Sequence, residues 1–150
     1  KVHETGIPFN DPSGDRLRSW IGLTREEFYD SRRIALVPMA FCYPGRGPSG
    51  DLPPRPECAA AWRSRLLGSM DNIRVTLVLG EYAQRWHFPE QANWSLQQRV
   101  ANWRDKFPRL IPMPHPSPRN NLWLRRNPWF EMEAVPTIRR AVLAIMAQDA

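Results

Sequence analysis

Three short apolar runs constrain the fold more than any other feature of this sequence. They occupy residues 34–37 (Ile-Ala-Leu-Val), 75–79 (Val-Thr-Leu-Val-Leu) and 110–113 (Leu-Ile-Pro-Met). A short, uninterrupted apolar run is typical of a strand that is buried on both faces of a parallel sheet. Segments with helical periodicity separate the runs. This alternation of strands and helices predicts an α/β fold with a short parallel sheet.

Helices are predicted from their end signals and from the spacing of their apolar residues. Ser13 is predicted to cap a helix that ends at Gly22, and Thr24-Arg25-Glu26-Glu27 has the spacing of a capping box. Gly80 is predicted to turn the second apolar run into a helix that carries Tyr82, Ala83 and Gln84. The other predicted helices are one with Ala60, Ala61, Leu66 and Leu67 at its apolar positions, one over residues 95–104, and one over residues 128–148 that Pro136 kinks or restarts.

The composition limits the class of protein. With 150 residues, of which 42% are hydrophobic, the chain can form one globular domain over residues 1–150, which excludes a disordered chain. No apolar run approaches the ~20 residues of a membrane span, and no signal peptide is visible. We expect a monomeric, cytoplasmic protein. Its two cysteines do not suggest a disulfide scaffold.

The charge balance favours a polyanionic partner. The formal net charge is +6, and Arg greatly outnumbers Lys. Guanidinium groups suit contacts with phosphates and also stack on aromatic faces. The alternative is that these arginines only cover solvated helix faces, and charge alone leaves this alternative open.

Two proline-rich loops follow predicted strands. Prolines cluster at residues 44–56 and 108–118. In open α/β sheets, ligands bind beyond the carboxyl ends of the strands, and the loops after Val37 and Met113 both leave from that edge. The two loops are therefore predicted to meet at one site. Prolines stiffen the second loop, so that His115 could donate a hydrogen bond to a developing negative charge. A lone histidine is more often structural.

The string His115-Pro116-Ser117-Pro118-Arg119-Asn120 resembles motif 2 of the uracil-DNA glycosylase superfamily. The resemblance implies a three-layer α/β/α fold with a short parallel central sheet. It implies that His115 is catalytic and stabilises the anionic base as it leaves. It also implies that Arg119 wedges into the duplex where the base has left, and that Ser117 and Asn120 belong to the DNA-binding loop. Arg125 follows the motif, and we expect it to contact the DNA backbone.

The N-terminal half resembles the iron–sulphur family 4 branch of that superfamily. Gly6-Ile7-Pro8-Phe9, followed by Gly14 and Leu17, is similar to a segment whose Phe stacks on uracil. Phe9 is thus the implied base platform, and the alternative is a core aromatic. Gly80-Glu81-Tyr82-Ala83-Gln84 is similar to a turn of the same branch. The Asn that reads uracil in the branch corresponds to Pro38, which has no side-chain donor or acceptor.

Cys42 and Cys58 are similar to two ligands of the four-iron, four-sulphur cluster of family 4. The resemblance implies that this chain begins just after the family's first motif, a Gly-x-x-Pro-Gly loop that positions the water. It also implies that the strand before that loop and the other two cysteines lie further upstream. The alternative is two ordinary buried thiols.

These resemblances imply a DNA-repair glycosylase that flips a deaminated base, uracil or a related one, and hydrolyses its N-glycosidic bond. The runner-up is a DNA-binding module that keeps the fold but has lost efficient excision. Two observations favour that alternative: Pro38 replaces the Asn that reads uracil, and no water-positioning loop precedes Gly6 in this sequence. A third reading, an enzyme of free nucleosides or nucleotides, fits the basic charge and Arg119 less well.

Overall fold

The computed structural model describes residues 5–148, and these divide into two compact units. The first, which we call the sheet unit, comprises residues 5–35 and 74–148. The second, the hairpin unit, comprises residues 36–73. The prediction of a single domain over residues 1–150 stays a prediction.

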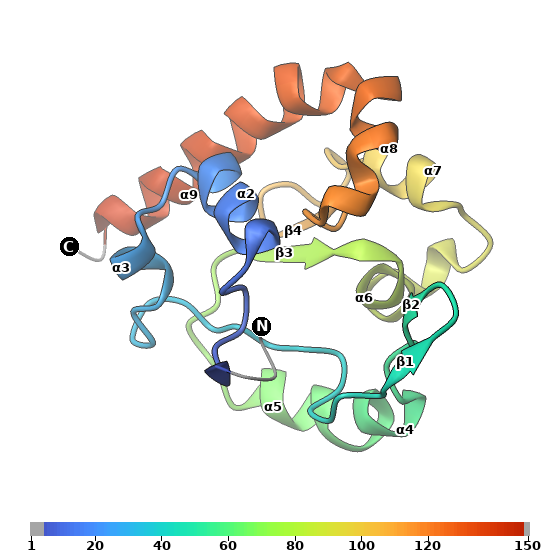
Figure 1. Cartoon of the computed structure of the whole chain (residues 1–150). Helices are drawn as coiled ribbons and strands as arrows, with labels where there is room; N and C mark the ends of the chain where they lie inside the picture. Colours follow the sequence, from blue (N-terminus) through green and yellow to red (C-terminus); the bar gives the residue numbers. More distant parts are fainter. Residues whose placement is uncertain (1–4, 149–150) are drawn as a thin grey trace. The chain divides into compact units, whose positions relative to one another are not determined.

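A two-stranded parallel sheet forms the centre of the sheet unit (Figure 1). Strand β3 (Thr76–Leu79) pairs with β4 (Leu110–Met113), with Thr76 opposite Leu110 and Leu79 opposite Met113. Val78, Ile111 and Met113 are almost completely buried. Two of the three predicted strands are therefore confirmed, and so is the α/β class with a short parallel sheet.

The third predicted strand is wrong. Residues 34–37 form no strand, and Ala35 is exposed while Ile34 is only half-buried. The run is not covered on both faces, which is what an uninterrupted apolar strand requires. Pro38 follows directly and has no N–H to donate to a neighbouring strand. The run also crosses the boundary between the two units.

Three short helices connect the two strands of the sheet. They are α6 (Gly80–His87), the 3₁₀ turn η2 (Pro89–Gln91) and α7 (Leu96–Ala101). Helix α7 begins with a capping box between Ser95 and Gln98. Both α6 and α7 pack against the strands. The predicted helix over residues 95–104 is therefore confirmed for its first part, and in the structure it ends at Ala101.

The N-terminal helices follow their capping signals. Helix α2 (Pro12–Ile21) is capped by Asp11, whose side chain accepts a hydrogen bond from the Gly14 N–H, and it ends at Gly22 with φ of 76°. The prediction of Ser13 as the cap is therefore wrong, because Pro12 already occupies the first helical position. The capping box of α3 (Arg25–Phe28), between Thr24 and Glu27, is confirmed.

The C-terminal segment packs on α2. After η3 (Pro118–Asn120) and α8 (Asn121–Arg126), a helix begins at residue 128, passes through the π-helical stretch η4 (Phe130–Ala134) and continues as α9 (Val135–Gln148). Figure 1 shows α9 alongside α2. The wider π turn lies just before Pro136, which cannot donate the usual backbone hydrogen bond. The best-buried apolar residues of this packing are Leu17, Trp20, Ile21, Phe130, Ala134 and Ile138.

The hairpin unit contains a short antiparallel pair and one helix. Strand β1 (Arg46–Gly47) pairs with β2 (Gly50–Asp51). The helix runs through α4 (Pro56–Cys58), the π-helical η1 (Ala59–Arg63) and α5 (Ser64–Gly68). Ala60 and Ala61 are exposed, whereas Ala59 and Arg63 are buried, so the predicted apolar face is wrong there. The π-helical turn changes the 3.6-residue spacing on which that prediction depended.

Within the described range, no helix is both long enough and apolar enough to cross a bilayer.

Candidate functional site

His115 lies just beyond the carboxyl end of β4, in a loop held by its own hydrogen bonds. The flanking residues Pro114 and Pro116 are fully buried, while the His115 side chain is open to solvent on one side. The Asn120 side-chain amide donates to the His115 carbonyl at 2.7 Å, and the Ser117 N–H donates to His115 Nδ1 at 3.2 Å. Two buried prolines and these bonds fix the direction of the imidazole.

The hydrogen bond from Ser117 assigns the tautomer of His115. Because Nδ1 accepts a hydrogen bond, the proton of the neutral ring belongs on Nε2. The protein packed around the ring desolvates it, which lowers the pKa of His115 below its usual value, and the negative charge of Asp11 opposes that change. His115 at neutral pH is therefore an uncharged donor that presents its Nε2–H.

Phe9 lies next to His115, although the two residues are far apart in the sequence. The ring centroids are 6.2 Å apart, and the ring planes differ by 22°. Phe9 also packs edge-on against Phe28, with centroids 6.1 Å apart. The structure therefore brings the predicted platform and the predicted catalytic residue into one site.

The backbone at Phe9 is held in a conformation that few non-glycine residues adopt. Its φ angle is 58°. The Tyr29 hydroxyl donates to the Pro8 carbonyl at 2.7 Å, and Arg18 donates to the Phe9 carbonyl at 3.4 Å. Gly14 lies directly below, because a Cβ built there would be 1.7 Å from the Phe9 carbonyl oxygen. Only glycine at position 14 permits this close approach.

The turn after β3 passes close to His115. Gly80 has φ of 81°, and a Cβ at this residue would be 3.3 Å from the Cβ of His115. In the helix that follows, α6, Gln84 is fully buried, and its amide donates to the Met113 carbonyl at 2.8 Å. It also donates to the Val78 carbonyl at 3.4 Å. Gln84 thus joins the carboxyl ends of both strands immediately before the His115 loop.

Three residues of this site were not identified from the sequence: Asp11, Arg16 and Gln84. Arg16 donates through Nη1 to the Pro116 and Ser117 carbonyls, each at 3.3 Å, and through Nη2 to Asn121 Oδ1 at 2.7 Å. Asp11 could have been found as an N-cap, since Pro12 follows it. Nothing in the sequence marks Arg16. Gln84 stands in the string that resembles a family turn, but its hydrogen bond to Met113, 29 residues away, could not be read from that string.

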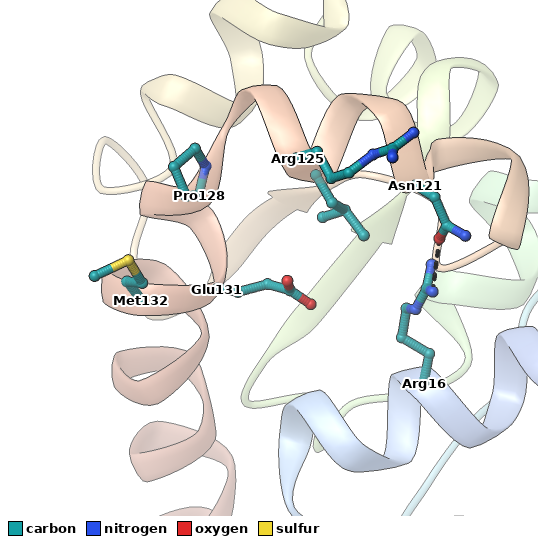
Figure 2. A pocket seen from close by; sticks show the side chains of 7 residues that line it. Arg16, Asn121, Arg125, Pro128, Glu131 and Met132 are labelled. Atoms are coloured by element: carbon teal, nitrogen blue, oxygen red, sulfur yellow. Dashed lines mark hydrogen bonds between the residues drawn. The ribbon is translucent and has the colours of Figure 1, made fainter.

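The predicted DNA-binding residues surround the His115 loop. Arg119 is exposed on η3, and Arg125 is exposed on α8, where it lines a cleft with Arg16 (Figure 2). The Ser117 hydroxyl accepts a hydrogen bond from the Arg119 N–H at 3.3 Å. The side chains of Ser117 and Asn120 therefore shape the loop itself.

The other predicted site residues belong to the hairpin unit. Pro38 is exposed, and its carbonyl accepts a hydrogen bond from Arg63 at 3.1 Å. Cys42 is exposed and Cys58 is half-buried, and both thiols are free. Because this unit is described by itself, the prediction that its proline-rich loop shares a site with His115 stays a prediction. The strand on which that prediction relied is absent from residues 34–37.

The donor set does not by itself fit an iron–sulphur cluster. A four-iron cluster needs four ligands, and Cys42 and Cys58 supply two thiolates. Among residues 5–148, no group of three or more His, Cys, Asp or Glu side chains is arranged to hold a metal ion.

The geometry of Phe9 and His115 agrees with a comparison against protein families. The model of the family "Uracil DNA glycosylase superfamily" matches residues 1–139, which is most of the chain. This range includes Phe9, the Gly80 turn and the His115 loop. The chain therefore belongs to the uracil DNA glycosylase superfamily.

Proposed function

We propose that this protein is a monofunctional DNA glycosylase that flips a deaminated base out of DNA and hydrolyses its N-glycosidic bond. Membership of the superfamily supports a DNA glycosylase-like role. The observation that carries the finer proposal is the near-parallel placement of the Phe9 and His115 rings, 6.2 Å apart. One ring offers a flat surface for a base, and the other offers a hydrogen-bond donor next to it.

The chemistry follows from the charges that form during cleavage. When the bond between C1′ and the base nitrogen breaks, both electrons stay with the base, and the sugar becomes oxocarbenium-like. A base lying on Phe9 would place an oxygen near the Nε2–H of His115, where negative charge develops. A fixed donor at that point lowers the barrier. Water then adds its hydroxyl to C1′, and its proton goes to the departing base.

The neutral state of His115 suits this role. A hydrogen bond from neutral imidazole stabilises the anionic base without a proton having to be taken up first. The desolvation that lowers the pKa of His115 keeps the ring neutral at physiological pH. Asp11 adds a negative charge close by, and such a charge would also favour a cationic sugar.

The proposed substrate class stays at deaminated bases, uracil or a related one, rather than uracil alone. Pro38 has no side-chain donor or acceptor that could read the edge of uracil. Phe9 gives an aromatic face, and stacking on such a face tolerates every base. Arg119 and Arg125 are proposed to contact the DNA, with Ser117 and Asn120 fixing the loop that carries Arg119. The predicted monomeric state and cytoplasmic location stay predictions.

The test is excision from oligonucleotides that each contain one uracil, hypoxanthine or xanthine, followed by alkaline cleavage at abasic sites. We expect cleavage of at least one substrate and none of an undamaged oligonucleotide of the same sequence. Absence of cleavage from all three, with correctly folded protein, would contradict the proposed activity.

A second candidate function is a DNA-binding module without efficient excision. The observation that favours it is Pro38, which is exposed and whose carbonyl is already bonded to Arg63. This candidate predicts salt-sensitive DNA binding together with no alkali-labile product. The same oligonucleotides separate the two candidates, because binding and cleavage are read out independently.

The four-iron cluster predicted from the resemblance stays a prediction. It requires two thiolates in addition to Cys42 and Cys58. A complete protein that carries the cluster would contain iron and absorb visible light, and Cys42→Ala would abolish both. Iron-free, colourless protein would exclude the cluster.

A further inference from the structure

A cleft lies beside the His115 loop, on the face formed by α2, α8 and the start of η4. Its volume is about 560 Å³, which is within the range of small-molecule sites. It is lined by Arg16, Asn121, Leu124, Arg125, Pro128, Glu131 and Met132 (Figure 2). The cleft contains neither Phe9 nor His115, so the proposed base site does not account for it.

We propose that this cleft binds one nucleotide of the DNA strand next to the flipped nucleotide, with its phosphate at Arg125 and its base edge at Glu131. The inference rests on the proposed function in one respect, namely that the ligand is DNA.

The first argument is position. Arg16 lines the cleft and also donates hydrogen bonds to the carbonyls of Pro116 and Ser117 in the His115 loop. Its other nitrogen donates to Asn121, which lies at the start of α8 and also lines the cleft. The cleft is thus separated from the loop by a single side chain, and a strand that delivers a base to the loop would continue into it.

The second argument is charge. Arg16 and Arg125 contribute two positive charges to the lining, against one negative charge from Glu131. Arg119 and Arg126 are exposed on η3 and α8, which adjoin the cleft in sequence. The guanidinium of Arg125 makes no hydrogen bond or ion pair with any residue that the structure describes, so it is available to a phosphate. A polyanionic strand complements this distribution.

The third argument is the fixed carboxylate of Glu131. The Trp20 indole N–H donates to Oε1 at 3.0 Å, which sets the orientation of the side chain. Oε2 accepts no hydrogen bond from the described residues, and Figure 2 shows the carboxylate directed into the cleft. A site that took only phosphate would gain nothing from a negative charge. A carboxylate does suit the amino group of cytosine, to which Glu and Asp bind in base recognition.

The apolar residues of the lining fit the same ligand. Leu124, Pro128 and Met132 provide a surface for a sugar or a base face, and Met132 is 75% exposed. Methionine is unbranched and polarisable, and it makes favourable contacts with aromatic rings. The competing occupant is a peptide of another protein, and the tests below distinguish it from DNA.

The phosphate contact is tested by the salt dependence of DNA binding, measured by fluorescence anisotropy with a short single-stranded oligonucleotide. Removing one phosphate contact in Arg125→Ala should reduce the slope of log K against log salt by about 0.7. The matched control is Arg109→Ala, since Arg109 is exposed at the amino end of β4, away from the His115 loop. An unchanged slope in Arg125→Ala, or an equal loss in Arg109→Ala, would overturn the phosphate assignment and favour a peptide occupant.

The base contact is tested with oligonucleotides in which the neighbours of the target are cytosine or thymine. Wild-type protein should bind the cytosine version more tightly by about fivefold, and Glu131→Ala should remove this preference. Glu131→Gln keeps an acceptor for Trp20 and adds a donor, so it should shift the preference toward thymine. Equal binding of both versions by wild-type protein would overturn the base assignment.

These binding measurements do not require excision. If the wild-type protein cleaves none of the substrates but Arg125→Ala reduces the salt slope, the proposed activity is contradicted and the phosphate contact in the cleft is supported. If the wild-type protein cleaves a substrate but Arg125→Ala leaves the salt slope unchanged, the proposed activity is supported and the phosphate contact in the cleft is contradicted.

Discussion

At the scale of single residues, the proposed chemistry depends on the protonation state of His115. Its Nδ1 accepts the Ser117 N–H at 3.2 Å, so the ring donates from Nε2 when neutral. Desolvation by the surrounding protein lowers the pKa of the ring, and the charge of Asp11 partly offsets this. A neutral donor at pH 7 is the outcome.

This balance predicts the titration of His115. NMR titration of the imidazole should give a pKa below 6.5, the usual value for histidine. Asp11→Asn should lower it further, because the substitution removes the charge that stabilises imidazolium. Asn is as good an N-cap as Asp, so α2 should remain intact. A pKa that rises in Asp11→Asn would show that the charge of Asp11 does not act on this ring.

The lowered pKa of His115 also determines how pH affects the stability of the fold. The folded-state pKa of His115 is lower than that of the unfolded chain, so the folded protein resists protonation. The corresponding stabilisation is complete above the unfolded pKa and is lost as the pH falls from there through the lower folded pKa. Acid should therefore weaken the fold through His115.

The contact between Gly14 and Phe9 makes a second prediction at this scale. A Cβ at position 14 would be 1.7 Å from the Phe9 carbonyl oxygen, so Gly14→Ala must displace the Phe9 backbone. We expect a loss of about 2 kcal/mol in the free energy of unfolding and weaker excision, measured by denaturant titration and by oligonucleotide cleavage.

Gly68→Ala is the matched control for that substitution. Gly68 lies at the end of α5, and a Cβ there meets nothing within 4 Å. Alanine should be neutral or stabilising at this position. If both variants were equally stable, the close approach of Gly14 to Phe9 would not constrain the site.

At the scale of elements, the site depends on α2 being tied to the loop that follows β4. Arg16 makes this connection through bonds to Pro116, Ser117 and Asn121. Asp11 and Phe9 lie at the amino end of the same helix. One helix therefore positions the predicted base platform, a nearby negative charge and the loop that carries His115.

Removing this connection should impair excision more than folding. Arg16→Met keeps the length of the apolar stem but loses all three hydrogen bonds. The loop would be less well fixed, and we expect excision to slow by about tenfold or more, because small displacements in an active site are costly. The loss of stability should stay near 1 kcal/mol, since Arg16 is only partly buried. Arg109→Met is the control, and equal excision by the two variants would exclude a positioning role for Arg16.

Local signals predicted the elements that depend on local interactions. The capping box at Thr24 and the strands at residues 76–79 and 110–113 are present as expected. The strand prediction for residues 34–37 was wrong because no described part of the protein covers this run on both faces, and because Pro38 follows it. Ala60 and Ala61 are exposed because a π-helical turn interrupts the regular spacing. Apolar periodicity could predict neither result, because it assumes regular helices and strands that pack against another surface.

At the scale of the whole molecule, the site combines residues that no local pattern connects. Phe9 and His115 were predicted from a resemblance to a family, and the structure places their rings side by side. The contacts of Arg16 and Gln84 could not be predicted, because they depend on carbonyl groups that reach these side chains only after folding. Asp11 could have been recognised from Pro12, but its position near His115 could not.

The central claim is that Phe9 and His115 form one site at which a base is excised, and the single-turnover rate of excision tests it most directly. His115→Ala should lower this rate by about 10²- to 10³-fold, as expected for the loss of one fixed donor to a developing anion, with DNA affinity changed little. Excision by His115→Ala at the wild-type rate would contradict the claim.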